Sequence, residues 1–151
     1  MSATTTPLPR KLGLTGEIVF TVRHAPAGFA ALLEAEGGTG DAIWQQTMLA
    51  PIDVVIAFHT RRDALVAEWP KLTAPLASDG AVWVAWPTHD TDPVTGSPAD
   101  LSADRARAAL EPLGWVPAKS CTIDDTWSAA RFERRQRPLR PKEAARARRG
   151  R

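Results

Sequence analysis

The 151-residue chain has a single cysteine, Cys121, so no disulfide bond can form within it. No CxxC pattern and no cysteine–histidine cluster surrounds this residue, which removes the usual sequence signals of a structural zinc site. Cys121 falls in a predicted strand, and we expect it to act as a small buried hydrophobic residue rather than as a reactive thiol. So little cysteine fits a reducing compartment and predicts a cytoplasmic protein.

Long apolar segments are also missing. No apolar run approaches the ~20 residues that a helix needs to cross a bilayer. Residues 1 to 9 are polar and rich in proline and threonine, without the apolar centre of a signal peptide. These absences predict a protein without membrane contact. The length suits one globular domain that buries roughly two thirds of its surface.

The net charge of +2 is unevenly distributed along the chain. Residues 131 to 151 hold ten Arg or Lys against two Glu, a net charge of +8 that leaves −6 on residues 1 to 130. No apolar face follows residue 134, so residues 135 to 151 are predicted to form a disordered basic tail.

A basic tail attracts nucleic acid, because each phosphate contact releases counterions. The alternative is a solvated tail without a partner, and the chain has no aromatic residue after Phe132 on which a base would stack. The side chains named by the nucleic-acid hypothesis are Arg134, Arg135, Arg137, Arg140, Arg146, Arg148 and Arg149.

Short apolar runs alternate with helical patterns, and no internal repeat is present. Continuous apolar runs are typical of parallel strands that are covered on both faces. The predicted strands are residues 18–22, 42–49 (a weaker pattern), 53–58 and 81–86, followed by a hairpin of 115–123 and 127–134.

Three helices are predicted between these strands. The first starts with Pro26 at its first position, where the missing N–H costs nothing. The second starts with a capping-box pattern at Thr60 and Asp63, and Leu65, Trp69, Leu72 and Leu76 follow on one face. The third carries Ala106, Ala109, Leu110 and Leu113 on one stripe and ends at Gly114.

Strands that alternate with helices at this spacing indicate βαβ crossovers. The predicted fold class is α/β, a three-layer Rossmann-like, mostly parallel sheet with a C-terminal antiparallel hairpin that adds one antiparallel strand at an edge. Residues 1 to 11 are predicted to be a flexible arm, and residues 12 to 134 the folded domain.

The order of these elements resembles that of class I S-adenosylmethionine-dependent methyltransferases. The matching pieces are "IVFTV", "DVVIAFHT", "LASDGAVWVAW" and the final hairpin. More specifically, "KLGL", "HAPAGFAALL", "VWVAWP" and "DDTWSAARF" resemble a family of short, uncharacterised bacterial proteins that carry a domain of unknown function. This resemblance covers residues 11 to 134 and implies a methyltransferase-like fold without an established activity.

The chain departs from the methyltransferase pattern at several positions. The glycine-rich turn that lets backbone N–H groups approach the cofactor is reduced to Gly28, and Pro26 removes a donor. The second strand ends in Gln45 and Gln46, without the carboxylate that would hold the ribose hydroxyls. His59 and Thr60 stand where amino-methylating enzymes carry Asp/Asn-Pro-Pro-Tyr, and a third βα unit is missing.

Candidate ligand-binding residues lie beyond the carboxyl ends of the predicted strands, where open α/β sheets bind ligands. The three histidines, His24, His59 and His89, each follow one of three strands that are neighbours in the methyltransferase order. The complete candidate set is His24, Ala25, Pro26, Gly28, His59, Thr60, Pro87 and His89.

Imidazoles with a carboxylate such as Asp90 or Asp92 suit zinc binding or acid–base chemistry. The alternative is three unrelated loop histidines, and no HxxxH spacing supports a metal. We therefore expect no metal site from the sequence. No catalytic residue is identified.

Other polar and aromatic residues have structural interpretations. Asp124 and Asp125 suit a turn between two strands, and Arg131 is expected to pair with an acid, Asp125 being one candidate. Trp83 and Trp86, on opposite faces of one strand, are expected in the core, as are Trp127 and Phe132 on the last strand.

The leading functional hypothesis is a non-catalytic module that binds a small ligand or a protein on a degenerate cofactor scaffold, with no cofactor. The first alternative is a divergent S-adenosylmethionine-dependent methyltransferase that uses residues 23 to 28. The second is a nucleic-acid-associated protein that acts through its tail.

Overall fold

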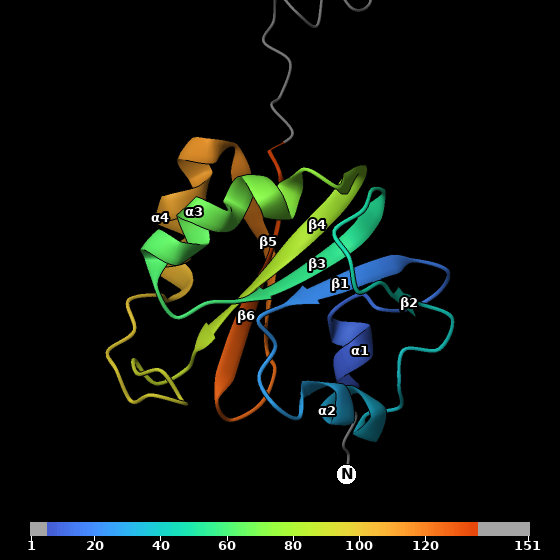
Figure 1. Ribbon diagram of the computed structural model, residues 1–151, viewed down its shortest axis with the longest axis horizontal. Helices are drawn as coiled ribbons and strands as arrows, with labels where there is room; N and C mark the ends of the chain where they lie inside the picture. Colours follow the sequence, from blue (N-terminus) through green and yellow to red (C-terminus); the bar gives the residue numbers. More distant parts are fainter. Residues whose placement is uncertain (1–5, 136–151) are drawn as a thin grey trace, which may run out of the picture.

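The computed structural model describes residues 6 to 135. In this part of the chain, helices and strands alternate as the apolar pattern predicts (Figure 1). In chain order the elements are α1 (Leu8–Lys11), β1 (Val19–Arg23), α2 (Phe29–Ala35), β2 (Ile43–Trp44), β3 (Ile52–Phe58), α3 (Arg62–Thr73), β4 (Leu76–Pro87), α4 (Ala103–Leu110), the 3₁₀ helix η1 (Glu111–Leu113), β5 (Trp115–Thr122) and β6 (Trp127–Arg134).

The strands form one sheet in the order β2-β1-β3-β4-β6-β5. β1, β2, β3 and β4 pair in parallel, whereas β6 pairs antiparallel with both β4 and β5. The predicted mostly parallel sheet with a C-terminal hairpin is confirmed. One detail is corrected, because the antiparallel strand β6 lies inside the sheet and β5 is the edge strand.

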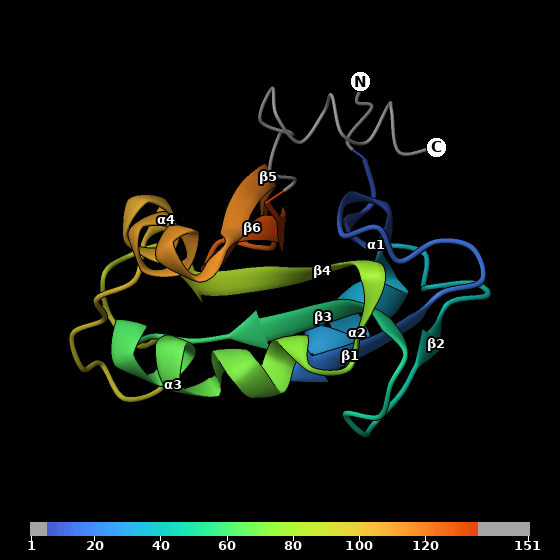
Figure 2. The same cartoon turned by 90° about the horizontal axis from the view of Figure 1, so that it is seen from above.

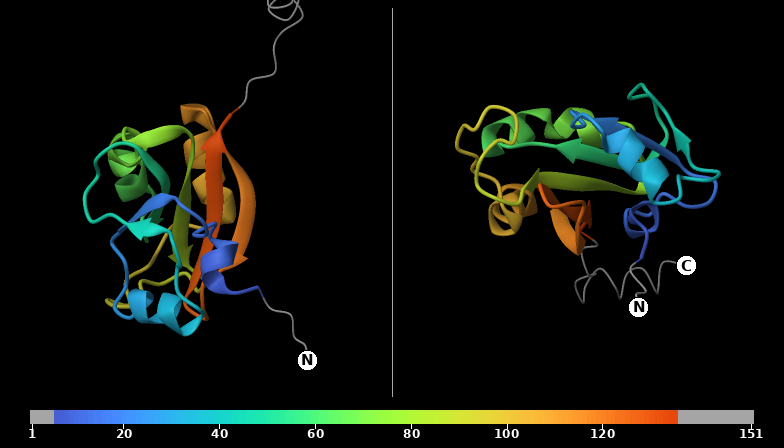
Figure 3. Two further views of the ribbon diagram at one scale, coloured as in Figure 1. Left: turned by 90° about the vertical axis from the view of Figure 1, so that its right-hand side faces the viewer. Right: turned by 90° about the horizontal axis from the view of Figure 1, so that it is seen from below.

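Helices cover both faces of the sheet and make three layers. One core joins α3 and α4 to the face that carries Val82, Val84 and Trp86. The other joins Leu8 of α1 and Phe29 of α2 to the opposite face, which carries Trp83 and Ala85. Figure 2 and Figure 3 show α3 and α4 gathered at one end of the molecule and α1 and α2 at the other. The predicted core positions of Trp83 and Trp86 on opposite faces are confirmed.

The N-terminal arm is shorter than predicted. Leu8 and Leu12 are buried, and the Leu8 backbone N–H donates to the Glu36 carboxylate at 2.9 Å. The indole of Trp83 donates to the Leu12 carbonyl at 2.9 Å. These contacts fix residues 8 to 11 as a helix, so the arm expected over 1 to 11 is wrong for this part. Residues 1 to 5 lie outside the described residues.

The helix starts also differ from prediction. Pro26 lies before α2, which begins at Phe29 after Gly28, a residue with φ of 90°. At α3 the N-cap position is Arg61 and makes no side-chain cap; instead the Arg62 N–H donates to the Asp100 carboxylate at 2.6 Å. A loop residue distant in sequence therefore replaces the predicted cap at Thr60 and Asp63.

Two further boundaries are corrected. The weak strand predicted over 42–49 is confined to Ile43–Trp44. Leu113 was expected on the buried stripe of the third helix, but it lies in η1 and is 48% exposed. A proline inside a helix removes a backbone hydrogen bond and often ends the helix. Pro70 lies inside α3, and the helix nevertheless continues to Thr73.

No helix in the described residues has the length and apolar character needed to span a membrane.

Candidate functional site

The candidate site lies at the carboxyl edge of the parallel strands. β1 ends at Arg23 and β3 ends at Phe58, and the pairing of Arg23 with Ala57 aligns the two ends. His24 and His59 directly follow these strands and lie close together, with ring centroids 5.1 Å apart. The His59 backbone N–H donates to the Ala85 carbonyl at 2.9 Å, which ties its loop to β4.

Both histidines meet the carboxylate of Glu68, which projects from the second turn of α3. His59 Nε2 lies 2.7 Å from Glu68 Oε1, and His24 Nε2 lies 3.0 Å from Oε2. Arg23 donates to Oε2 through Nε at 3.1 Å and through a terminal nitrogen at 2.8 Å. Helical side chains lean toward the helix N-terminus, which brings Glu68 back to the sheet edge. We call Arg23, His24, His59 and Glu68 the Glu68 cluster.

Burial differs within the Glu68 cluster. The side chains of His59 and Glu68 are 7% and 12% exposed, whereas that of His24 is 50% exposed. His24 also has a left-handed backbone with φ of 60°, a conformation uncommon outside glycine. His59 and Glu68 thus form the buried part of the cluster, and His24 is its most exposed member.

The charge states follow from this burial. Burial lowers the pKa of His59, and its hydrogen bond to Glu68 opposes that effect only in part. Burial alone would raise the pKa of Glu68, but the hydrogen bonds from Arg23 and His59 outweigh it and lower the pKa. Glu68 is therefore a carboxylate at neutral pH, and His59 is a neutral imidazole that donates its Nε2 proton to it.

A cavity of about 600 Å³ opens beside the cluster. We call it the histidine cavity. It is lined by His24, Ala25, Pro26, Ala27, Phe58, His59, Thr60, Ala64, Asp92, Val94, Thr95 and Trp127.

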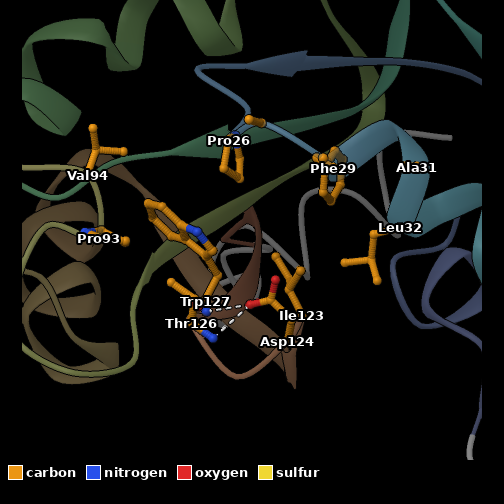
Figure 4. A pocket seen from close by; sticks show the side chains of 12 residues that line it. Pro26, Phe29, Ala31, Leu32, Pro93, Val94, Ile123, Asp124, Thr126 and Trp127 are labelled. Carbon is orange, nitrogen blue, oxygen red and sulfur yellow. Dashed lines mark hydrogen bonds between the residues drawn. The ribbon is translucent and has the colours of Figure 1, made fainter.

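A second cavity of about 550 Å³, the apolar cavity, shares Pro26, Ala27, Val94 and Trp127 with the first. In Figure 4 the Trp127 ring stands between Val94 and Pro93 on one side and Phe29 and Leu32 on the other. Trp127 packs edge-on against Phe58 at 5.1 Å, so it belongs to the core, as predicted, and also forms a wall of both cavities.

The structure brings most of the predicted ligand-binding residues to this edge. His24, Ala25, Pro26, His59 and Thr60 line the histidine cavity, and Gly28 lines the apolar cavity. The other two residues lie apart from these linings. Pro87 is buried at the end of β4, and His89 is exposed in the following loop, outside the Glu68 cluster.

Glu68 was missed by the sequence analysis. A signal was present, since Glu68 stands three residues after Leu65 and four before Leu72 and so shares their helix face. A carboxylate on a stripe that otherwise enters the core indicates a buried polar partner.

The remaining polar predictions have mixed outcomes. Asp124 accepts from the backbone N–H groups of Thr126 and Trp127, both at 2.8 Å, which confirms its turn role (Figure 4). Arg131 pairs with Glu133 at 2.8 Å, so the suggested partner Asp125 is wrong. Cys121 is half-buried in β5 rather than fully buried.

Two of the arginines named for nucleic-acid contact make bonds within the folded part. Arg134 donates to the Ala77 and Ser78 carbonyls and lies over the Trp115 ring, 4.9 Å from its centre. Arg135 donates to the Glu111 carbonyl at 3.1 Å. The others, Arg137, Arg140, Arg146, Arg148 and Arg149, lie outside the described residues.

No protein-family model matches the chain, and no curated protein matches it in sequence. Solved structures of methyltransferases are similar to it in fold. Mitomycin 7-O-methyltransferase MmcR is 14% identical with a TM-score of 0.58, over 85% of this chain and 53% of MmcR. The 1,6-didemethyltoxoflavin-N1-methyltransferase of Burkholderia thailandensis, with bound S-adenosylhomocysteine, is 12% identical with a TM-score of 0.54, over 85% and 75%.

The DhpI–SAH complex is 16% identical with a TM-score of 0.52, over 87% of this chain and 84% of DhpI. The chain spans about half the length of MmcR, the first of these structures. Identities this low show the fold alone. That fold is Rossmann-like and similar to the fold of these methyltransferases, as the sequence resemblance implies.

Proposed function

We propose that this chain is a non-catalytic protein that binds a small molecule in the histidine cavity. The observation that carries the proposal is the cavity's lining. Trp127, Val94 and Pro26 supply apolar walls, while His59 and Thr60 supply polar groups at one end. Ligand sites commonly combine apolar walls with a few convergent polar groups and an ionisable residue with a perturbed pKa. The expected ligand has an apolar body and one polar head group.

The local chemistry favours a ligand other than S-adenosylmethionine. The side-chain amide of Gln45, where a ribose-binding carboxylate is expected, donates to the Thr47 and Leu49 carbonyls of its own loop. Gly28 is the single glycine between β1 and α2, and Pro26 has no N–H to offer. These features support a scaffold that has changed its ligand.

A small ligand is also favoured over a docked protein. Large contiguous apolar patches on a protein surface mark sites where other proteins bind. The large apolar side chains exposed in the described residues come from separate segments: Ile43 and Leu49 around β2, Val66 on α3, Val94 in the loop before α4, and Leu113 in η1. Of these, Val94 lines the cavities.

The test is an NMR titration of the full ¹⁵N-labelled chain with benzoate, benzyl alcohol and acetate. Benzoate combines an apolar body with an anionic head group, and the other two probes each lack one of these parts. We expect benzoate to bind most tightly and to shift the backbone amides near the cavity, which are those of residues 24, 25, 27, 28, 59, 60, 92, 94 and 95. Weak shifts spread over the whole surface would contradict the proposal.

A matched pair of variants checks the location. Val94 is 87% exposed and Leu113 is 48% exposed, so a charge at either position leaves the core intact. Val94→Glu should weaken benzoate binding by about tenfold, the loss of roughly 1.4 kcal/mol. Leu113→Glu, outside the cavities, should leave it unchanged.

A divergent S-adenosylmethionine-dependent methyltransferase is the second candidate function. It is favoured by the apolar cavity, whose lining includes residues 26 to 29 between β1 and α2, the junction that holds nucleotide-binding loops in many α/β proteins. Calorimetric titration with S-adenosylhomocysteine separates the two candidates. Micromolar binding would select the methyltransferase, whereas no heat and no thermal shift at millimolar concentration would support the non-catalytic proposal.

A further inference from the structure

We propose that His24, His59 and Glu68 form a binding site for a divalent transition-metal ion, with zinc as the best chemical match. The two imidazoles and the carboxylate each offer one ligand atom, and these three atoms all lie within 4.8 Å of one another. Two histidines and one glutamate are a known ligand set for catalytic zinc. In the described residues no other group of three such side chains comes together.

The spacing is close to what a tetrahedral ion needs. Bonds of about 2.0–2.1 Å to a common ion place neighbouring ligand atoms about 3.3 Å apart. His59 Nε2 and His24 Nε2 lie 2.7 and 3.1 Å from Glu68 Oε1, and the three ligand atoms all lie within 4.8 Å of one another. Small side-chain rotations would bring the separations to the tetrahedral value, and His24, half exposed to solvent, has room to move.

The proposed ligand atoms are one ring nitrogen of each imidazole and one oxygen of Glu68. A neutral histidine binds a metal ion through the ring nitrogen that carries no proton, so the proton that His59 Nε2 donates to Glu68 would move to Nδ1 when an ion binds. Arg23 donates both of its hydrogen bonds to Oε2, so the ion would take Oε1 in place of the hydrogen bond from His59. Arg23 would then act as an outer partner that orients the carboxylate.

Three protein ligands leave a coordination position open. Both histidines line the histidine cavity, so that position is accessible from it. Structural zinc sites are closed by four protein ligands, whereas sites with three bind water or another molecule in the fourth position. The site would therefore take an anionic or electron-donating head group, such as a carboxylate. This last step rests on the proposed function, but metal binding itself does not.

The experiment uses the untagged full chain, stripped of metal with a chelator and dialysed. Zn²⁺ is titrated by calorimetry, and Co²⁺ is followed by its visible absorption, which distinguishes a four-coordinate ion from a hydrated one. We expect one Zn²⁺ per chain and a Co²⁺ spectrum of low coordination number. Failure to bind either ion would overturn the proposal and leave a simple ion-pair cluster.

Variants locate the ion. His24→Asn removes a ligand while asparagine tolerates the left-handed backbone at this position. Loss of an outer partner alone weakens metal binding by about 10–100-fold, so loss of this ligand should cost at least about tenfold. His89→Asn removes a loop histidine outside the cluster and should change nothing. Equal effects of the two variants would also overturn the proposal.

Glu68→Gln provides a second check, because it keeps the side-chain shape and removes the charge. His24→Asn remains decisive where Glu68→Gln fails to fold, since His24 is exposed. Benzoate is titrated in chelator and again with Zn²⁺. Benzoate binding that persists in chelator, with no Zn²⁺ bound, would reject the metal site alone, whereas Zn²⁺ binding without benzoate binding would reject the ligand proposal alone.

Discussion

The Glu68 carboxylate has three partners, Arg23, His24 and His59. Removing its charge weakens the interaction with each of them. Charge-assisted hydrogen bonds contribute about 1.5–3 kcal/mol each when buried, but Arg23 is 30% exposed and His24 is 50% exposed, so solvent reduces the sum. We expect Glu68→Gln to lower the free energy of unfolding by about 1–2 kcal/mol. The measurement is urea denaturation in chelator, which removes any contribution from a bound ion.

The control for this change is Glu34→Gln. Glu34 is exposed on α2 and makes no side-chain hydrogen bond or ion pair in the described residues. Its loss should change stability by less than about 0.5 kcal/mol. Equal effects of the two substitutions would mean that the Glu68 cluster contributes nothing specific to the fold.

Cys121 gives a pH-dependent prediction. Burial raises the pKa of its thiol, and the charge of Lys11 offsets this only in part. The reactive thiolate therefore forms at a higher pH than in an unfolded chain. We expect alkylation by iodoacetamide at pH 8 to be slower in the folded protein than in urea. Lys11→Ala should slow it further, because a charge that favours the thiolate is lost; a faster reaction in this variant would contradict the assignment.

At the scale of the elements, hydrophobic runs were the reliable signal. Residues 54–58 and 81–86 are apolar without a break, and both lie in central strands covered on both faces. Asp124 marked the hairpin turn correctly, because its side chain bonds to nearby backbone whatever the rest of the fold does. Local chemistry was sufficient for these elements.

Contacts between distant residues were not predictable in the same way. The Asp100 carboxylate caps α3 by accepting a hydrogen bond from the Arg62 N–H, 38 residues earlier in the chain. The Glu36 carboxylate accepts from the Leu8 N–H, 28 residues earlier. The candidate site likewise contains residues that local sequence placed correctly and one, Glu68, that it did not. The sequence placed His24 and His59 at the same edge of the sheet, because each follows one of two neighbouring strands, but left open whether they meet. The position of Glu68 depends on where α3 passes over that edge, which the sequence does not show. His89 follows a neighbouring strand too, but its longer loop carries it away.

At Gly80, the close packing of neighbouring backbone restricts which residue β4 can hold. Residues 78–80 are Ser-Asp-Gly, a combination typical of turns, but they lie within β4. There the register with β3 changes from the Ile52–Leu76 pair to the Val54–Ala81 pair. A Cβ at Gly80 would lie 3.1 Å from the backbone oxygens of both Asp53 and Ala77. Backbone cannot move aside as a side chain does. We expect Gly80→Ala to cost about 1–3 kcal/mol of stability, measured by thermal and urea denaturation.

Ser78→Ala is the matched control, since Ser78 is exposed in the same strand. It should be nearly neutral. If Gly80→Ala proved equally mild, the close approach of the two strands at this irregularity would be wrong.

At the scale of the whole molecule, charge is divided between the body and the end of the chain. Residues 136 to 151 hold seven Arg or Lys and one Glu. The nucleic-acid hypothesis predicts that the full chain binds duplex DNA with an affinity that falls with salt, the logarithmic slope being no steeper than about −6 for seven phosphate contacts. A chain ending at Arg135 should lose this binding in fluorescence anisotropy. Undiminished binding by the shortened chain would reject the tail as the contact.

The sharing of one carboxylate has an evolutionary consequence. While Glu68 is present, replacing Arg23 or His59 removes a partner from a buried charge and is costly. Once Glu68 has changed, the same replacements leave no charge stranded and become nearly free. The order of substitutions therefore matters. When the residues of the cluster are replaced one at a time, we expect Glu68 to be replaced first. Among related sequences, these positions should be retained or lost as a set.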